Sequence, residues 1–134
     1  MTWLFDSNVL LASVLASHAH HRRVHEWLRS QRVTKFATCV ITQGALLRLL
    51  MRFGRDRSAG AAWRTLELVV RSPGHQFWDD GFSYLEVSHR FLQGPGQVTD
   101  AWLAKLAEER QGKLATLDEA CAALHRSVAV LINP

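Results

Sequence analysis

The sequence of 134 residues contains no long apolar run and only two cysteines. No segment approaches the roughly 18 consecutive apolar residues that a membrane-spanning helix requires. The first residues also lack the basic and apolar regions of a secretory signal peptide. Cys39 and Cys121 lie far apart and match no metal-binding spacing, so we expect buried thiols and no disulfide. We therefore expect a cytoplasmic protein without a membrane segment.

Internal repeats, low-complexity tracts and interdomain linkers are also missing. So are the Gly-x-Ser-x-Gly frame of a serine nucleophile and a glycine-rich phosphate loop. Hydrophobic residues make up 48% of the chain and charged residues 21%, values that are typical of globular proteins. At this length we expect one domain that spans residues 1–134.

The formal net charge is +4, which permits an anionic partner such as nucleic acid without requiring one. Arginine, whose planar guanidinium suits phosphate, predominates among the cations. A basic group after the start of the predicted third helix has two open interpretations, phosphate binding or a solvated surface. It consists of Arg48, Arg52, Arg55 and Arg57.

Short apolar segments alternate with amphipathic helical patterns along the whole chain. Strands are predicted at residues 3–5, 35–40, 75–78, 113–117 and 128–132. Helices are predicted near residues 9–15, from 22, after an N-cap at Thr42 up to Gly54, at 58–71, 82–92, after Thr99 to near Gly112, and at 120–124. This alternation predicts a three-layer α/β sandwich, whose central, mostly parallel sheet of about five short strands carries helices on both faces.

Polar residues occur where predicted strands end or helices begin. Asp6 and Asp118 follow strands, while Gln43 and Asp100 each follow a threonine at a predicted helix start. In α/β folds function gathers beyond the carboxyl ends of the strands, so these side chains can converge there. Each aspartate alone is equally explained as a helix cap.

Carboxylates brought close together repel one another and raise their own pKa values. A hard divalent cation relieves this repulsion, and oxygen ligands favour Mg²⁺ or Mn²⁺ over Zn²⁺. We therefore predict a metal site formed by Asp6, Asp100 and Asp118, with Gln43 beside them.

Five segments carry a resemblance to a known family. Residues 4–11 resemble the opening of PIN-domain proteins, especially VapC-type toxins of bacterial toxin–antitoxin pairs. The other four resemble later motifs of that family in the same order, and the matches span nearly the whole chain. They are HHRRVHEWL at 20–28, ITQGALLRLL at 41–50, VTDAWL at 98–103 and LATLD at 114–118.

The resemblance implies a Mg²⁺- or Mn²⁺-dependent endoribonuclease in which metal-activated water hydrolyses an RNA phosphodiester. Asp6, Asp100 and Asp118 would be the acidic metal ligands. Thr116 would orient the site by hydrogen bonding, and the residues at positions 7 and 8 are further candidates for that role. A homodimer and a small cognate antitoxin are implied as well.

One position departs from the family pattern, because Gln43 stands where a glutamate is common. The amide keeps an oxygen for a cation or a water but has no charge and cannot act as a base. An inactive PIN domain that binds RNA or protein is therefore an alternative. A different Mg²⁺-dependent phosphotransfer domain is a third, although it would want an acid where Asn8 stands.

Four histidines surround the predicted second helix start, at positions 18, 20, 21 and 25. Their spacing matches no standard metal-ligand set, and a solvated loop is the better interpretation. His21 has the further option of approaching RNA. The five tryptophans fall mostly at inward helical positions, which favours core packing over base stacking.

Overall fold

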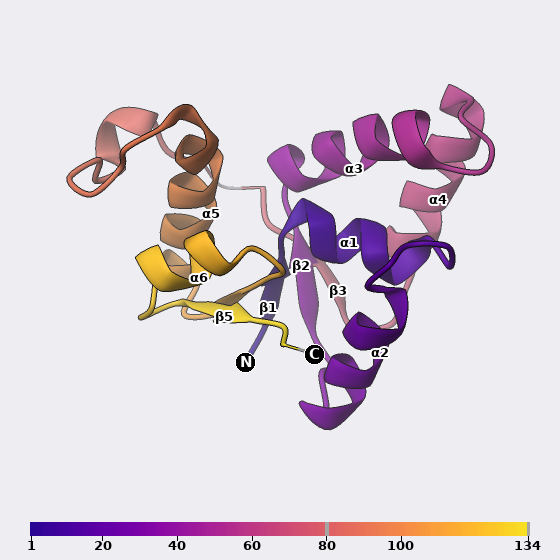
Figure 1. Ribbon diagram of the computed structural model, residues 1–134, viewed down its shortest axis with the longest axis horizontal. Helices are drawn as coiled ribbons and strands as arrows, with labels where there is room; N and C mark the ends of the chain where they lie inside the picture. Colours follow the sequence, from indigo (N-terminus) through magenta and orange to yellow (C-terminus); the bar gives the residue numbers. More distant parts are fainter. Residues whose placement is uncertain (80, 134) are drawn as a thin grey trace.

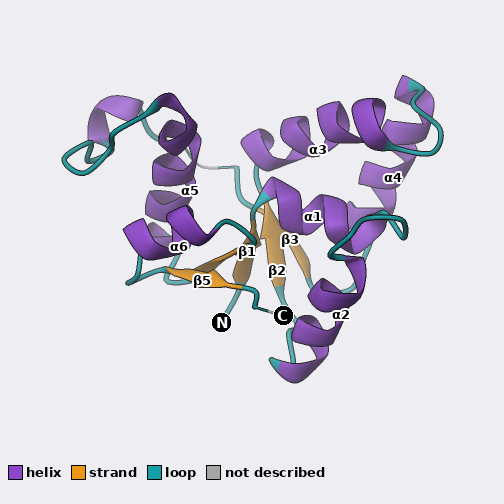
Figure 2. Ribbon diagram, in the orientation of Figure 1, coloured by secondary structure: helices purple, strands orange, loops and turns teal. Residues whose placement is uncertain are grey.

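The computed structural model describes residues 1–79 and 81–133. The predicted unit 1–134 also includes positions 80 and 134, which lie outside the described residues. Strands and helices alternate along the described chain (Figure 1, Figure 2). The strands are β1 (Trp3–Phe5), β2 (Phe36–Thr38), β3 (His75–Phe77), β4 (Lys113–Thr116) and β5 (Ala129–Leu131). The helices are α1 (Ser7–Val14), α2 (His21–Ser30), α3 (Val40–Phe53), α4 (Ala59–Val70), α5 (Val98–Glu109) and α6 (Glu119–Leu124).

The strands form one sheet in the order β3-β2-β1-β4-β5, and every pairing is parallel. The central strand β1 pairs Trp3 with Phe36 of β2 on one side and Phe5 with Ala115 of β4 on the other. A parallel sheet needs crossover connections, and the helices supply them.

The two faces of the sheet are covered by different helices. Leu4, Ala37 and Leu114 face α5 in one apolar core. The alternate residues along the same strands, such as Phe5, face α1 and α3 in a second core. Figure 1 shows α5 and α6 on the left and α1 to α4 on the right and above. The expected three-layer α/β sandwich is confirmed.

One tight turn requires a glycine. Gly74 has φ +84, and an added Cβ there would collide with the carbonyl oxygen of Thr34. This turn brings β3 alongside β2, with His75 opposite Phe36. The strand β3 thereby places His75 beside Thr38 of β2, and Thr38 in turn contacts Gln43 in the first turns of α3.

The predicted N-cap of the third helix was wrong. Helix α3 begins at Val40 with Cys39 as its N-cap. Thr42 lies inside the first turn, where its buried hydroxyl accepts from the Cys39 N–H at 3.0 Å. Thr42 therefore lies inside the helix and satisfies the N–H of the N-cap residue, instead of being the N-cap itself. Similarly, α5 begins at Val98 with Gln97 as its N-cap, so Thr99 is not the cap.

The helix predicted over residues 82–92 was also wrong. This segment contains one 3₁₀ turn, η1 (Tyr84–Glu86), closed by a capping box between Ser83 and Glu86. Leu85 is 96% exposed and Phe91 71% exposed. Val87, in contrast, is buried, and Phe82 stacks on Trp102. Apolar residues at helical spacing stabilise a helix only when they share one buried face, and here they do not.

Other expectations agree with the structure. Both cysteines are free and buried. Four of the five tryptophans are buried, whereas Trp63 is 56% exposed. No helix within the described part of the chain is long and apolar enough to cross a membrane.

Candidate functional site

Asp6 is a buried carboxylate just beyond the end of β1. Its N–H donates to the carbonyl oxygen of Ala115 at 3.0 Å, which ties it to the neighbouring strand. The side chain is only 6% exposed, and Oδ1 accepts from the Ser7 N–H at 2.7 Å. Burial raises the pKa of Asp6, the hydrogen bonds from Thr116 and Ser7 lower it in part, and the charge of Asp118 raises it further. Asp6 thus acts as the cap of α1 while facing another acid.

Thr116 connects Asp6 to Asp118. Its buried hydroxyl donates to Oδ2 of Asp6 at 3.0 Å and accepts from the Asp118 N–H at 3.0 Å. Asp118 caps α6, where its Oδ1 accepts from the N–H groups of Ala120 and Cys121. One hydroxyl therefore holds the ends of β1 and β4 together and orients the Asp6 carboxylate.

Asp100 approaches these two acids from another element, the first turn of α5. Burial, followed by the charges of Asp6 and Asp118, raises its pKa to about 6. Three carboxylates from remote positions in the sequence therefore come near one another at a single edge of the sheet. Such mutual repulsion is the condition that a cation relieves.

Gln43 lies in the first turns of α3, which begins at the same carboxyl edge. Its Nε2 donates to the Thr38 hydroxyl at 3.0 Å, and this hydroxyl lies 2.8 Å from Nε2 of His75. Thr38 is fully buried at the end of β2. The chain Gln43–Thr38–His75 was missed in the sequence, because no spacing relates a residue on β3 to α3.

The oxygen donors fit a hard divalent cation in type and charge. Among residues 1–79 and 81–133, however, no group of three or more His, Cys, Asp or Glu side chains lies close enough to hold a metal ion. After the effect of burial, the charge of Asp118 raises the pKa of Asp6, and the charges of Asp6 and Asp118 raise the pKa of Asp100. If a cation binds at this edge, Asp6, Asp100 and Asp118 are the residues that would hold it.

The remaining candidates have different surroundings. Ser7 donates to Asp6, whereas Asn8 is exposed. His21 and His25 bond the carbonyl oxygens of Ala12 and Ser13 at the end of α1. These two histidines therefore join α2 to α1, in the place where a solvated loop was expected.

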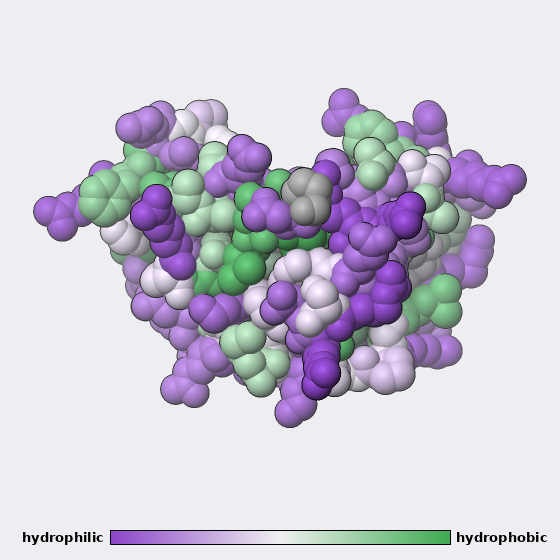
Figure 3. All heavy atoms as spheres, turned by 60° about the horizontal axis from the view of Figure 1, so that its bottom comes forward, coloured by the Kyte–Doolittle hydropathy of each residue, from purple (hydrophilic) through white to green (hydrophobic). Residues whose placement is uncertain are grey.

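The surface around the acidic edge lies between two raised parts of the molecule. Helix α5 belongs to one and α3 with α4 to the other (Figure 1). The space-filling view, in which the opposite edge of the sheet comes forward, shows a dip in the outline between these two parts (Figure 3). The predicted basic group of Arg48, Arg52, Arg55 and Arg57 is exposed on and after α3. Within the described residues, none of the ion pairs involves these four arginines.

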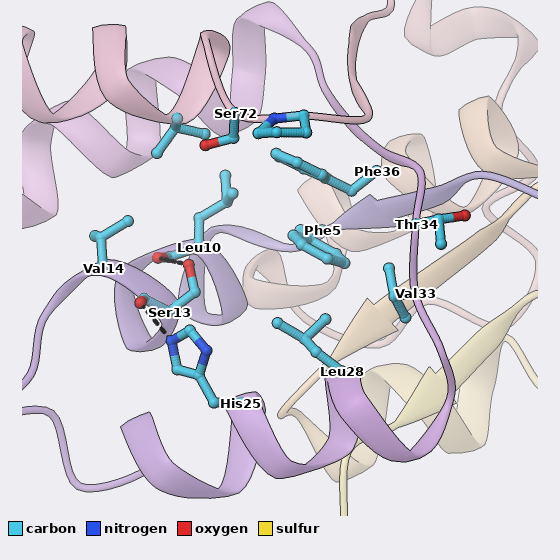
Figure 4. A pocket seen from close by; sticks show the side chains of 12 residues that line it. Phe5, Leu10, Ser13, Val14, His25, Leu28, Val33, Thr34, Phe36 and Ser72 are labelled. Atoms are coloured by element: carbon cyan, nitrogen blue, oxygen red, sulfur yellow. Dashed lines mark hydrogen bonds between the residues drawn. The ribbon is translucent and has the colours of Figure 1, made fainter.

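A separate hollow of about 290 Å³ lies between α1 and α2, beside Phe5 of β1. The rings of Phe5 and Phe36 stack at its wall, Leu10 and Leu28 point into it, and His25 turns to Ser13 at its rim (Figure 4). None of the three acids lines it. Its apolar lining gives it no part in the acidic site.

The fold is a parallel α/β sandwich with three acids at the carboxyl edge of the sheet, and three comparisons show to which family it belongs. A family model described as the PIN domain matches residues 3–127. Ribonuclease VapC29 of Mycobacterium tuberculosis is 48% identical over 132 residues, which cover 98% of this chain and 97% of that protein. The chain therefore belongs to the PIN-domain family, and its predicted resemblance to VapC-type members is confirmed.

Solved structures agree in fold. VapBC2 from Rickettsia felis, bound to a DNA fragment from its promoter, has a TM-score of 0.68 at 13% identity and covers 98% of each chain. VapC20 of Mycobacterium tuberculosis, a sarcin–ricin loop cleaving toxin, has a TM-score of 0.63 at 15% identity, over 91% of this chain and 94% of that one. At these identities the likeness shows the fold alone. The PIN assignment also sets aside the third sequence alternative, a different phosphotransfer domain.

Proposed function

We propose that this protein is a Mg²⁺- or Mn²⁺-dependent endoribonuclease and the toxin of a toxin–antitoxin pair. The observation that carries the proposal is the position of three acids at the carboxyl edge of a PIN fold: Thr116 links Asp6 to Asp118, and Asp100 is close enough for their charges to raise its pKa. RNA as the substrate is supported by the names of its relatives, a ribonuclease and a sarcin–ricin loop cleaving toxin.

In this proposal the three aspartates hold the cation through their oxygens. When bound, the cation supplies activation of water and neutralisation of the charge that develops on the phosphate. Thr116 keeps Oδ2 of Asp6 in one direction, and the amide hydrogens of α6 fix Asp118. Gln43 offers an uncharged oxygen, so it binds the cation or orients a water molecule but cannot act as a base.

The exposed arginines on and after α3 offer positive charge to an anionic substrate. A guanidinium pairs well with phosphate, and Arg48 lies nearest along the helix to Gln43. We propose that these arginines bind phosphates that flank the cleaved bond. Binding of this kind weakens steeply as salt rises.

The test is cleavage of single-stranded RNA by the purified protein in Mn²⁺. Asp6→Asn and Asp100→Asn remove one ligand charge each with little change in shape, and each should abolish cleavage. Asp56→Asn is the matched control, because Asp56 is an exposed aspartate after α3 that caps only a turn at Ser58. Cleavage that survives at the wild-type rate in either site variant would refute the metal assignment.

The second candidate is a PIN domain that binds RNA or protein without cutting. Gln43 in place of glutamate, together with the open arrangement of the three acids, favours it. Calorimetric titration with Mn²⁺ separates the two functions. Absence of heat at millimolar Mn²⁺, with RNA binding retained, would support the binding module.

The proposal includes one PIN unit over residues 1–134, which forms a homodimer with a second copy and is neutralised by a separate small antitoxin that covers the acidic edge. Since the substrate is RNA, the activity belongs in the cytoplasm. Co-expression with the product of the adjacent reading frame tests the pairing: it should relieve growth inhibition by the wild-type protein. The Asp100→Asn variant should not inhibit growth, so co-expression should make no difference to its growth.

A further inference from the structure

The side chain of Gln43 is held at one end by a buried hydrogen-bond chain that runs into the sheet. Its Nε2 meets Oγ1 of Thr38 at 3.0 Å, and the same Oγ1 lies 2.8 Å from Nε2 of His75. The amide nitrogen can only donate, so it occupies one acceptor site of the hydroxyl. A single proton must then lie between Thr38 and His75.

The position of that proton follows from burial. Thr38 is 0% exposed, so its hydroxyl group cannot donate a hydrogen bond to bulk water. Burial also lowers the pKa of His75, so the ring is neutral and carries one N–H. If that N–H were on Nε2, the hydroxyl proton of Thr38 would have no acceptor among Gln43 and His75, and an unpaired buried donor is unfavourable. If it is on Nδ1, Thr38 donates to Nε2 and each donor in the chain has an acceptor.

The sheet fixes His75 for this contact. His75 pairs with Phe36 in the β2–β3 register, and Thr38 is two residues further along the same face of β2. The rings of Phe36 and His75 meet edge to face at 5.3 Å. The imidazole is therefore held between the ring of Phe36 and the hydroxyl of Thr38.

We propose that Thr38 and His75 are positioning residues that fix the carboxamide of Gln43, with donation running from Gln43 to Thr38 to His75, so that Oε1 is the atom this position contributes to the acidic edge. The inference rests on the proposed metal-dependent function. It accounts for an amide at this position: the N–H that Gln43 donates to Thr38 holds the amide nitrogen against β2 and leaves Oε1 on the other side of the amide. Position 43 then presents an oxygen to a cation.

The direction of the chain is tested by the tautomer of His75. Long-range ¹H–¹⁵N NMR spectra of the ¹⁵N-labelled full chain at pH 8 distinguish a protonated from an unprotonated ring nitrogen, and His75→Gln identifies the signals by their loss. We expect Nδ1 protonated and Nε2 unprotonated. A protonated Nε2 would overturn the proposal, because the chain would then run the other way and Gln43 would present its nitrogen.

Gln43→Glu supplies an independent prediction. A carboxylate has no proton to donate, so Thr38 must donate to Glu at this position, and the Nε2–H of His75 must donate to Thr38. The His75 tautomer should therefore reverse in this variant. An unchanged tautomer would show that residue 43 and His75 are not coupled, and would overturn the proposal.

The effect on the site is measured with Thr38→Val, which removes the hydroxyl and keeps the shape. The matched control is Thr65→Val, because the Thr65 hydroxyl donates only to Ala61 within α4. Loss of a partner that orients a ligand lowers metal affinity by about tenfold, and we expect this for Thr38→Val only. Equal affinity in Thr38→Val and the wild type would refute the positioning role. If the wild type binds no Mn²⁺, the proposed function fails, while the two tautomer measurements still decide the direction of the chain.

Discussion

The hydroxyl of Thr116 donates to Oδ2 of Asp6 at 3.0 Å, across 110 positions of sequence. The hydroxyl oxygen of Thr116 also accepts from the Asp118 N–H at 3.0 Å. Since Thr116 is fully buried, neither bond competes with water. The hydroxyl thus fixes the geometry between the first and the last acid of the proposed site.

Replacing Thr116 by valine should damage both stability and activity. The Asp118 N–H and Asp6 would each lose a partner, at a cost of about 1–3 kcal/mol in the free energy of unfolding. Misorientation of Asp6 should lower RNA cleavage about 10–100-fold. Urea unfolding and a cleavage assay measure the two effects. Thr116→Ser is the control, and a serine variant as defective as the valine variant would contradict a role for the hydroxyl.

Asp100→Asn should stabilise the metal-free protein while removing cleavage. The folded-state pKa of Asp100, about 6, lies above its usual value of 3.8, so folding disfavours its charged form. That penalty is fully present above pH 6 and disappears as the pH falls toward 4. Because the side chain is only half-buried, we expect a gain of about 1 kcal/mol at pH 8. Thermal melts with a chelator should show the gain at pH 8 and a smaller one at pH 4.5; equal melts at both pH values would contradict it.

Mn²⁺ affinity should depend on pH. Protons compete with a cation for the same oxygens, and Asp100 takes up its proton near pH 6. Affinity should be constant above pH 7 and fall by up to about tenfold per pH unit below pH 6. Calorimetry across pH 8 to 5 measures the dependence. An affinity that does not change over this range would exclude Asp100 as a ligand.

Cys121 should be inert in the folded protein. It is buried next to the acidic edge, and burial followed by the charges of Asp100, Asp6 and Asp118 raises its pKa to about 12. The thiolate is the reactive form, so alkylation at pH 8 should be slow until the protein unfolds. Mass spectrometry after brief labelling with and without denaturant tests this, with labelling of both cysteines expected only in denaturant. Rapid labelling of Cys121 in the native protein would contradict it.

Much of the fold follows from local patterns in the sequence. Each predicted strand agrees with an observed one to within two residues at either end. Four of them are short, largely buried apolar runs bounded by polar residues, whereas β3 is mostly exposed. Two helix predictions were wrong. Helix α3 begins at Val40 because the Thr42 hydroxyl accepts from the Cys39 N–H from inside the first turn. Residues 82–92 form no helix because their apolar side chains do not share one buried face: Val87 is buried in the core, whereas Leu85 and Phe91 are exposed.

The candidate site divides in the same way. The sequence by itself determined that Asp6 and Asp118 follow strands and that Asp100 begins a helix, because these positions depend on local hydrophobic patterns and turns. The tertiary structure alone decided that Thr116 binds both Asp6 and Asp118, and that Gln43 is held through Thr38 by His75. These contacts depend on strand order and register, which bring together residues that no spacing along the chain relates.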